Sequence, residues 1–468
     1  MTAHSQPAPD DRIVEQDILE HEEREDYARS RVPEHARRST GAVFMVLVGI
    51  VTAFFFPTVG GSYLLAYGAA ATWIALVVGF LILIALTLVV ASAASREGLT
   101  AELLTRGCGY GFVGSVLTTL IYAATFVLYT ALEGQILATS IDQIWDLPDI
   151  VWYIIVGLIF IPLTWYGMTQ LTWIMWLTFP IYIVLVTIAV VKAVNENGGF
   201  PTELFTAVPE GSITGILGFL GVMAGLAGTI GLNPMEASDY NRFIAADRFK
   251  KVAWKSIVLP YALMFFVAMP LGMFFTLITN EINPAVYFSS LLGVGLGVLL
   301  AWISQVRINL TNVHLGSIAL TSAAQRVTKR PPGRMVWVTV VAVLSILLMQ
   351  ADVLANVLGF LEWNGMFLLA WVGTVVADLL IVRKALGIVR GPIEYREGYI
   401  RKVNPVGVTA LVAAVLVGSI LLYAADGTLL RGLAPYIAFA VAVVVHTAMA
   451  VATKGRYYLS DPAPERAR

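Results

Sequence analysis

The chain has 468 residues, of which 58% are hydrophobic and only 13% are charged, and its mean hydropathy is +0.78. Soluble domains carry about 25% charged residues, so this composition excludes an ordinary water-soluble enzyme. No Asp, Glu, Lys or Arg occurs between Arg38 and Arg96, and that stretch has room for two membrane-spanning helices of about 20 residues each. We predict an all-α, polytopic membrane protein that is not an enzyme.

The charge balance and the cysteine content exclude several other classes. The formal net charge is −1, and no basic stripe lies outside the expected loops, so nucleic acid is not an expected partner. Cys108 is the only cysteine, and one thiol forms neither an internal disulfide nor, by itself, a zinc site. We expect no cofactor and no bound metal; the expected partners are a small-molecule substrate and membrane lipid.

Twelve apolar stretches are of roughly membrane-spanning length, and we predict one span at each. They cover residues 41–67, 69–94, 111–139, 149–167, 171–193, 213–246, 253–279, 286–325, 335–350, 352–382, 404–424 and 432–452.

Lys and Arg are distributed unequally between the two sets of loops. If both ends of the chain are cytoplasmic, the inner loops hold 17 basic residues and the outer loops hold two, which the positive-inside rule favours strongly. We predict a multi-pass protein of the inner cell membrane with both termini in the cytoplasm.

The expected organisation follows from this topology. An acidic cytoplasmic tail over 1–40, with a short amphipathic helix around Ile13 to Leu19, precedes ten spans that form a core over 41–382. A cytoplasmic loop over 383–403, helices eleven and twelve within 404–452 and a tail over 453–468 complete the chain.

The first and sixth spans are interrupted in a similar way. The first contains Pro57, Gly60 and Gly61, and the sixth reads GLAGTIGLNPMEASDY, with Gly231 and Asn233 next to a proline. Glycine and proline weaken a helix, and unwound backbone at membrane depth is tolerated where it lines a cavity. Broken helices five spans apart are typical of an inverted five-plus-five repeat with a midplane binding site, although glycine and proline are also common in ordinary membrane helices.

Ionisable side chains inside a bilayer are costly and mark candidate sites. Within the predicted spans they are Glu133, Glu236, Asp239, Arg307, His314, Glu362, Asp378 and His446. Asp378 lies close to Arg383 and Lys384, so we expect a structural role for it, and we expect His446 at the interface of a peripheral helix. Glu362 is open to either interpretation.

Arg307 is the most informative of these residues, because at least fifteen residues on each side of it carry no formal charge. It cannot easily reach the membrane surface, so a carboxylate or a carbonyl cluster must receive it. Glu133 and Glu236 are the available carboxylates. The pair is either a structural ion bridge or a site in which the guanidinium replaces or senses a transported cation.

Two helical faces offer groups for a small planar ligand. In span eight, Asn309 and Asn312 share a face at i, i+3, and amides suit the hydrogen-bonding edge of a heterocycle. In span three, Tyr122, Phe126, Tyr129 and Glu133 recur at helical spacing, which allows stacking on a ring. Ordinary helix packing explains such an aromatic stripe equally well.

Several motifs together resemble the nucleobase:cation symporter-1 family, which includes the purine-cytosine permeases and the hydantoin, allantoin and thiamine carriers. They are VPEHARRS, SREGLTAELLTRGCGYGFVGS, ASDYNRF, INLTNVHLGSIAL, VADLLIVRK and IEYREGYIRKVNPVG, in this order. The resemblance covers most of residues 31–420. It implies twelve helices in a LeuT-like inverted-repeat fold, alternating access, and a nucleobase-like substrate between spans one, three, six and eight.

By resemblance, Phe126 occupies the place of a span-three Gln that reads the base, Tyr129 that of the stacking aromatic, and Asn309 that of a substrate-binding asparagine. Arg307 and Ile308 stand where sodium-coupled members have Ser or Thr hydroxyls. A guanidinium repels sodium, so we expect this site not to use it. Coupling then runs through a proton at Glu133 or Glu236, or is absent.

The predicted function is transport of a small planar nitrogenous solute. The expected substrate-binding residues are Gly60, Phe126, Tyr129, Glu133, Gly231, Asn233, Glu236, Asn309 and Asn312, and the expected ion-coupling residues are Glu133, Glu236 and Arg307. A carboxylate one turn beyond Tyr129 favours a cationic heterocycle. The alternatives are an amino-acid or amine carrier on the same fold, whose carboxylate cradle would be Gly60 and Gly61, and a non-transporting membrane receptor.

Overall fold

A computed structural model describes residues 27–164, 168–328, 330 and 332–459, and the side chains of these ranges other than 168–175. Among them are nine helices long and apolar enough to cross a membrane, a tenth such span made of two helices bent by 45°, and two shorter apolar helices. The chain is therefore a multi-pass, all-α membrane protein. The predicted amphipathic helix around Ile13 to Leu19 lies outside the described residues.

The helices follow the predicted order of spans. The first five positions hold α2 (Thr40–Val51) with α3 (Phe55–Tyr67), α4 (Ala69–Glu97), α6 (Val116–Asp142), α7 (Asp149–Leu163) and α8 (Met168–Glu196). The next five hold α9 (Gly215–Asn241), the run of α10 (Ala246–Ala253), α11 (Leu259–Leu263) and α12 (Met269–Thr279), then α14 (Val294–Val327), α15 (Arg334–Gln350) and α16 (Val357–Val376), which π-helical turns extend to Ala385. Helices α17 (Pro405–Ala424) and α18 (Leu429–Ala452) complete the set, and α5 (Ala101–Thr105) and α13 (Pro284–Leu292) are short helices between spans.

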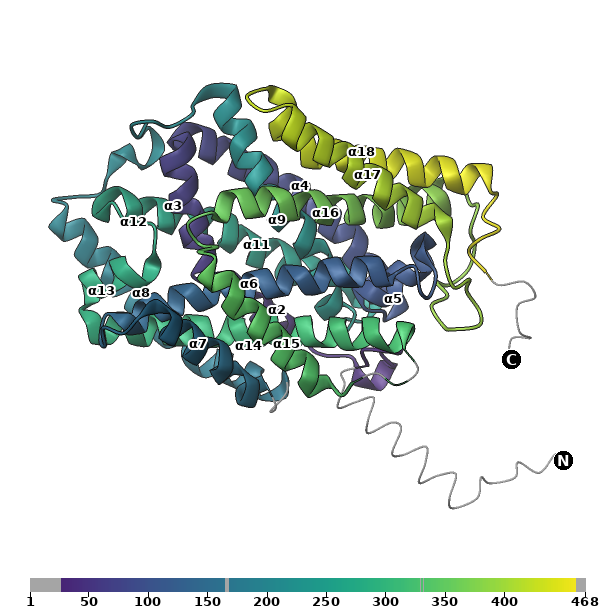
Figure 1. The fold of residues 1–468 in the computed structure, drawn as a ribbon, viewed down its shortest axis with the longest axis horizontal. Coiled ribbons are helices and arrows are strands. Elements are labelled where there is room, and N and C mark those ends of the chain that lie inside the picture. Colours follow the sequence, from purple (N-terminus) through teal and green to yellow (C-terminus); the bar gives the residue numbers. More distant parts are fainter. Residues whose placement is uncertain (1–26, 165–167, 329, 331, 460–468) are drawn as a thin grey trace, which may run out of the picture.

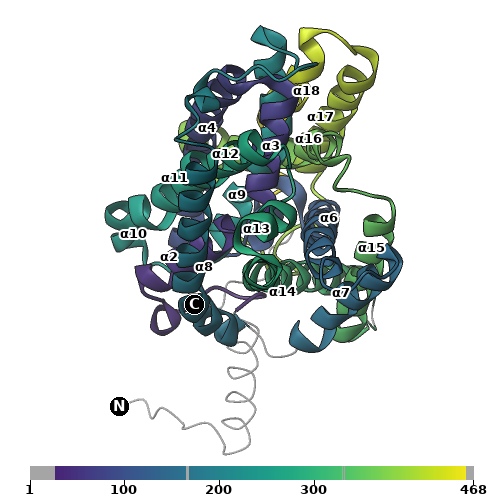
Figure 2. The same cartoon turned by 90° about the vertical axis from the view of Figure 1, so that its left-hand side faces the viewer.

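The two sets of five pack reciprocally. The first span packs on the seventh through α3 and α12, and the second packs on the sixth through α4 and α9. Helices α6 and α14 pack together, as do α7 and α15, which lie side by side at one edge of the bundle (Figures 1 and 2). This exchange of partners is what an inverted five-plus-five repeat requires, and α17 and α18 pack against α16 on the outside.

The first span is broken, but not where the glycines predict. The break lies between α2 and α3, around Thr52 to Phe54, whereas Pro57, Gly60 and Gly61 lie inside α3. Proline is tolerated in the first turn of a helix, and its ring clashes with the carbonyl four residues earlier. For Pro57 that carbonyl belongs to residue 53, so the chain is interrupted upstream of the proline.

The predicted break in the sixth span is wrong, because α9 is continuous from Gly215 to Asn241 with Pro234 inside it. Neighbouring groups bond to the backbone around the proline. The Asn233 amide donates to the carbonyl of Thr229 (2.7 Å), and the Tyr261 hydroxyl donates to the carbonyl of Asn233 (3.3 Å).

The eighth predicted span, 286–325, is divided in the structure. Helix α13 ends at Leu292, Gly293 adopts a φ of +85°, and α14 begins at Val294. A side chain would be strained at that angle, and glycine is not.

The two described ends of the chain meet at one end of the bundle (Figure 1). Arg31 donates to the carbonyl of Ile393 (2.7 Å), and Tyr458 donates to Asp378 in the same region (2.5 Å). The two ends of the described part of the chain, near Arg31 and Tyr458, therefore lie on the same side of the bundle.

Candidate functional site

A small cavity, which we call the inner cavity, lies where four spans meet. Its volume is about 20 Å³, and it is bounded by the break between α2 and α3 and by α6, α9 and α14. Its lining residues are Ile50, Ala53, Phe55, Phe56, Tyr129, Glu133, Thr229, Leu232, Asn233, Glu236, Ile308 and Asn312. A cavity of this size holds about one water molecule, so a heterocycle enters only if the surrounding helices move.

Five of the nine predicted substrate-binding residues line the inner cavity. They are Tyr129 and Glu133 of α6, Asn233 and Glu236 of α9, and Asn312 of α14. Residues from three helices far apart in the sequence thus converge on one point next to the helix break.

Two carboxyl groups face this space without a basic partner. Glu133 and Glu236 are 2% and 3% exposed, and no ion pair joins either of them to a described residue. The Glu133 carboxyl lies near the Gln305 amide and the backbone N–H of Phe55. Nearby, the Asn312 amide nitrogen is buried without a hydrogen-bond partner among the described residues. Buried charges are normally paired, so the inner cavity is suited to a ligand that brings a positive charge and hydrogen-bonding groups.

Aromatic rings form part of the wall of the inner cavity. The rings of Phe55 and Tyr129 lie 5.1 Å apart between centroids, and Phe56 packs edge-on against Phe55 at 5.2 Å. Neither phenylalanine was predicted to lie at the site, because the unwound segment was expected to follow them. The run Phe54-Phe55-Phe56 directly before Pro57 is the signal that could have identified them.

The other four predicted substrate-binding residues do not line the inner cavity. Phe126 packs edge-on against Tyr122. Asn309 does not line the cavity, although Ile308 and Asn312 of the same helix do, so the face that Asn309 was expected to share with Asn312 is only partly turned toward it. Gly60 and Gly231 lie at close helix contacts: a Cβ atom at Gly60 would lie 2.0 Å from the carbonyl oxygen of Met269, and one at Gly231 would lie 2.6 Å from the Cβ of Leu368.

Arg307 contacts the break itself. It is 1% exposed, and its Nη2 donates to the Thr52 hydroxyl (3.2 Å) while its Nε donates to the carbonyl of Ile303 (2.9 Å). The guanidinium carbon lies 5.5 Å from the ring centre of Tyr182 on α8. The expected ion pair with Glu133 or Glu236 is absent among the described residues, and a hydroxyl, a carbonyl and an aromatic ring surround the charge instead.

Asp378 and His446 form a separate buried cluster. Asp378 accepts hydrogen bonds from Arg383 (2.6 Å) and from the Tyr458 hydroxyl (2.5 Å), in keeping with the structural role we expected for it. His446 is fully buried and lies 3.4 Å from Asp378. His446 lies on the face of the peripheral helix α18 that packs against the end of α16.

Asp239 is also structural in this conformation. It accepts hydrogen bonds from the backbone N–H of Ala101 (2.8 Å) and from the Tyr122 hydroxyl (2.9 Å). Tyr122 is therefore held toward α9, and only Tyr129 and Glu133 of the predicted span-three ladder reach the inner cavity.

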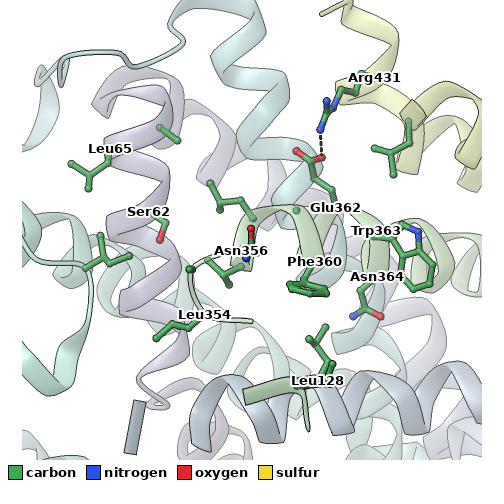
Figure 3. A pocket seen from close by; sticks show the side chains of 18 of the residues that line it. Ser62, Leu65, Leu128, Leu354, Asn356, Phe360, Glu362, Trp363, Asn364 and Arg431 are labelled. Carbon is green, nitrogen blue, oxygen red and sulfur yellow. Dashed lines mark hydrogen bonds and ion pairs between the residues drawn. The ribbon is translucent and has the colours of Figure 1, made fainter. Parts of the chain in front are cut away.

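A second, larger cavity, which we call the outer cavity, is lined by Ser62 and Leu65 of α3 and by Glu362 and Asn364 of α16, among others (Figure 3). Its volume is about 1230 Å³, and α3, α6, α16 and the ends of α17 and α18 contribute to its walls. Glu362 forms an ion pair with Arg431 at its edge (3.3 Å), and Asn364 accepts a hydrogen bond from Thr125 of α6 (3.0 Å). The outer cavity is large enough for a small ligand, whereas the inner cavity is closed.

Comparisons with known proteins agree with this arrangement. No protein-family model matches the chain, and no curated protein sequence matches it significantly. Among solved structures, the chain is similar to Mhp1, a nucleobase-cation-symport-1 family transporter, in a closed conformation with bromovinylhydantoin bound: the TM-score is 0.74 and the identity 17%, over 94% of this chain and 97% of that one.

Two further solved structures share the architecture at lower similarity. A Na⁺-coupled sialic acid symporter matches with a TM-score of 0.59 and 13% identity, over 89% of this chain and 90% of that one. A manganese transporter of Eremococcus coleocola matches with a TM-score of 0.56 and 13% identity, over 92% of this chain and 98% of that one. These structures are membrane transporters, and the predicted LeuT-like fold class is confirmed.

Proposed function

We propose that the chain is a secondary active transporter, a permease of the nucleobase:cation symporter-1 type, which carries a small planar nitrogenous solute by alternating access. The observation that carries this proposal is the inner cavity at the break of the first span, where Tyr129 and Phe55 offer ring faces and Glu133 and Glu236 offer carboxyl groups. By the positive-inside rule the termini are cytoplasmic, so the outer cavity faces the outside of the inner cell membrane.

The charge of the inner cavity favours a cationic heterocycle over a neutral nucleobase. A carboxylate pairs with a protonated ring nitrogen or an amine, and the aromatic face covers the ring. Two carboxyl groups without a basic partner would repel an anionic ligand and leave a neutral one with unpaired acceptors.

An amine carrier is the second candidate, and the same carboxyl groups support it. These carboxyl groups disfavour an amino-acid carrier, because they would repel the carboxylate of the substrate. The proposed cradle also has no room for it: Gly60 and Gly61 face α12, where a Cβ on Gly61 would lie 2.3 Å from the Thr276 hydroxyl oxygen.

We propose that transport is not coupled to sodium. Arg307 places a fixed positive charge at the Thr52 end of the break, and this charge takes the role of a bound cation there. Transport is then coupled to protons, with Glu133 or Glu236 as the proton carrier, or runs as uniport.

The test is uptake into proteoliposomes after a thermal-shift screen has identified a ligand. The screen covers nucleobases, hydroxymethylpyrimidines, thiamine, hydantoins, amines and amino acids, with sodium or potassium at two pH values, because a ligand of the native state raises the melting temperature. We expect a planar cation to bind and accumulate, and Glu133→Gln to reduce its uptake at least tenfold. Glu210→Gln, in an exposed loop, is the matched control and should leave uptake unchanged. A ligand that binds without accumulating would favour the receptor alternative.

A further inference from the structure

A third cavity lies at the end of the bundle where the two described termini meet, far from the inner cavity in the fold. We call it the arginine pocket. Its volume is about 840 Å³, and its walls come from the N-terminal segment, the end of α4, the turns after α16, residues 389–396 and the C-terminal segment.

The lining of the arginine pocket is strongly basic. It contains five arginines, Arg31, Arg96, Arg383, Arg390 and Arg396, against two acidic residues, Glu97 and Glu394. Burial alone would raise the pKa of Glu394, but the hydrogen bonds from Arg396 outweigh it and hold that pKa below its usual range. Even with both glutamates ionised and with Asp378 behind Arg383, positive charge remains in excess.

Several of these guanidinium groups keep free hydrogen-bonding capacity. Arg383 is held by Asp378 and by the carbonyl of Gly107, yet its Nη1 is buried without a hydrogen-bond partner among the described residues. Arg390 donates a hydrogen bond to the carbonyl of Gly387 in its own loop (3.1 Å). Arg96 makes a long contact with Glu97 (3.4 Å) and is 64% exposed.

We propose that the arginine pocket binds a phosphate-bearing anion. The guanidinium fork matches the geometry of phosphate oxygens and donates two hydrogen bonds at once. Basic pockets between membrane helices at the cytoplasmic surface hold the headgroups of acidic lipids, and a soluble phosphate compound has the same chemistry. The ligand would connect Arg31, Arg383 and the loop around Arg390, and so would tie both termini to the end of α16.

The experiment uses the purified full-length protein in nanodiscs. One arm compares phosphatidylcholine discs with discs that contain cardiolipin, and a second arm adds inorganic phosphate to phosphatidylcholine discs at constant ionic strength. The readouts are the melting temperature and the lipid retained in native mass spectrometry. The test variant is Arg96→Gln/Arg390→Gln, because these two arginines make the fewest contacts within the protein.

The matched control removes the same charge elsewhere. Arg248 and Lys250 are exposed on α10 and do not line the arginine pocket, so Arg248→Gln/Lys250→Gln tests for non-specific attraction. We expect the wild type and this control to be stabilised by several degrees in one of the two arms, and the test variant to lose at least half of that shift.

Each outcome decides the proposal. Stabilisation by cardiolipin alone identifies a lipid headgroup as the source of the phosphate, and stabilisation by inorganic phosphate alone identifies a soluble ligand. An equal response of the test variant and the control, or no response in either arm, overturns the proposal. Because none of these variants touches the inner cavity, the result is independent of the proposed transport function.

Discussion

Replacing Arg307 with serine tests whether its charge excludes sodium from the break of the first span. The side chain lies between Thr52, Ile303 and Tyr182 and has no acidic partner among the described residues. Serine would remove the charge and would leave a hydroxyl at position 307 of α14. This position does not line the inner cavity, although the neighbouring Ile308 does.

The expected size of the effect follows from Coulomb's law. A monovalent cation about 4 Å from the guanidinium is repelled by about 4 kcal/mol at an effective dielectric constant near 20, which corresponds to about a thousandfold weaker binding. A sodium ion that would otherwise bind in the millimolar range would then not bind at any practical concentration. In Arg307→Ser this repulsion is absent.

The assay compares NaCl with KCl at equal ionic strength. The wild type should show the same melting temperature and the same uptake rate in both salts, whereas Arg307→Ser should melt at a higher temperature in NaCl than in KCl. The variant loses two hydrogen bonds and will be less stable overall, but the comparison between salts on one variant removes that difference. Thr52→Val, which keeps the guanidinium and removes its hydroxyl partner, is the control and should stay insensitive to sodium. Sodium-stimulated uptake by the wild type would refute the reasoning.

Three further variants test the site and the packing around it. Tyr129→Ala should weaken ligand binding about two- to tenfold, because stacking on a ring contributes about 0.5–1.5 kcal/mol, while Tyr129→Phe should bind nearly normally; equal losses in ligand-shift assays would contradict stacking. Gly60→Ala should lower the melting temperature, since its Cβ would lie 2.0 Å from the Met269 carbonyl oxygen, whereas Gly295→Ala, with nothing within 4 Å, should not. Asp378→Asn should destabilise the protein by about 3–5 kcal/mol, because it leaves the Arg383 charge without its buried partner; unfolding in denaturant measures this, and an unchanged midpoint would contradict it.

Much of the fold could be predicted because membrane spans are marked by composition alone. The order of spans and the pairing implied by an inverted repeat followed from hydropathy and from two weak spans five apart. The location of the break did not, because glycine and proline signal a weak helix without fixing where it ends. The ring of Pro57 acts on a carbonyl four residues upstream, whereas α9 continues through Pro234 without a break. A local pattern does not say which of two prolines interrupts its helix.

The candidate site was predicted in part from helical spacing. Tyr129 and Glu133 are four residues apart on α6, share a face and both line the inner cavity, whereas Tyr122 and Phe126 of the same predicted ladder do not. Asn309 was assigned with Asn312 from their i, i+3 spacing and from a motif position, and neither says how a helix is rotated in its own packing. Phe55 was missed for the same reason that the break was misplaced.

Arg307 lies on α14 between the break of the first span and the residues that line the inner cavity. Ser304 donates to the carbonyl of Thr52 (3.1 Å), and Arg307 donates to its hydroxyl, while Ile308 and Asn312 of the same helix reach the inner cavity on the other side of the break. In a sodium-coupled carrier an ion that binds here would attach the broken helix to its neighbour only while it is bound. In the function proposed above, the covalently tethered guanidinium makes this attachment permanent, and a sodium gradient has nothing to act on at this point. We therefore propose that any driving force enters through a group that can change its charge during the cycle, and Glu133 and Glu236 are the groups lining the inner cavity that can do so.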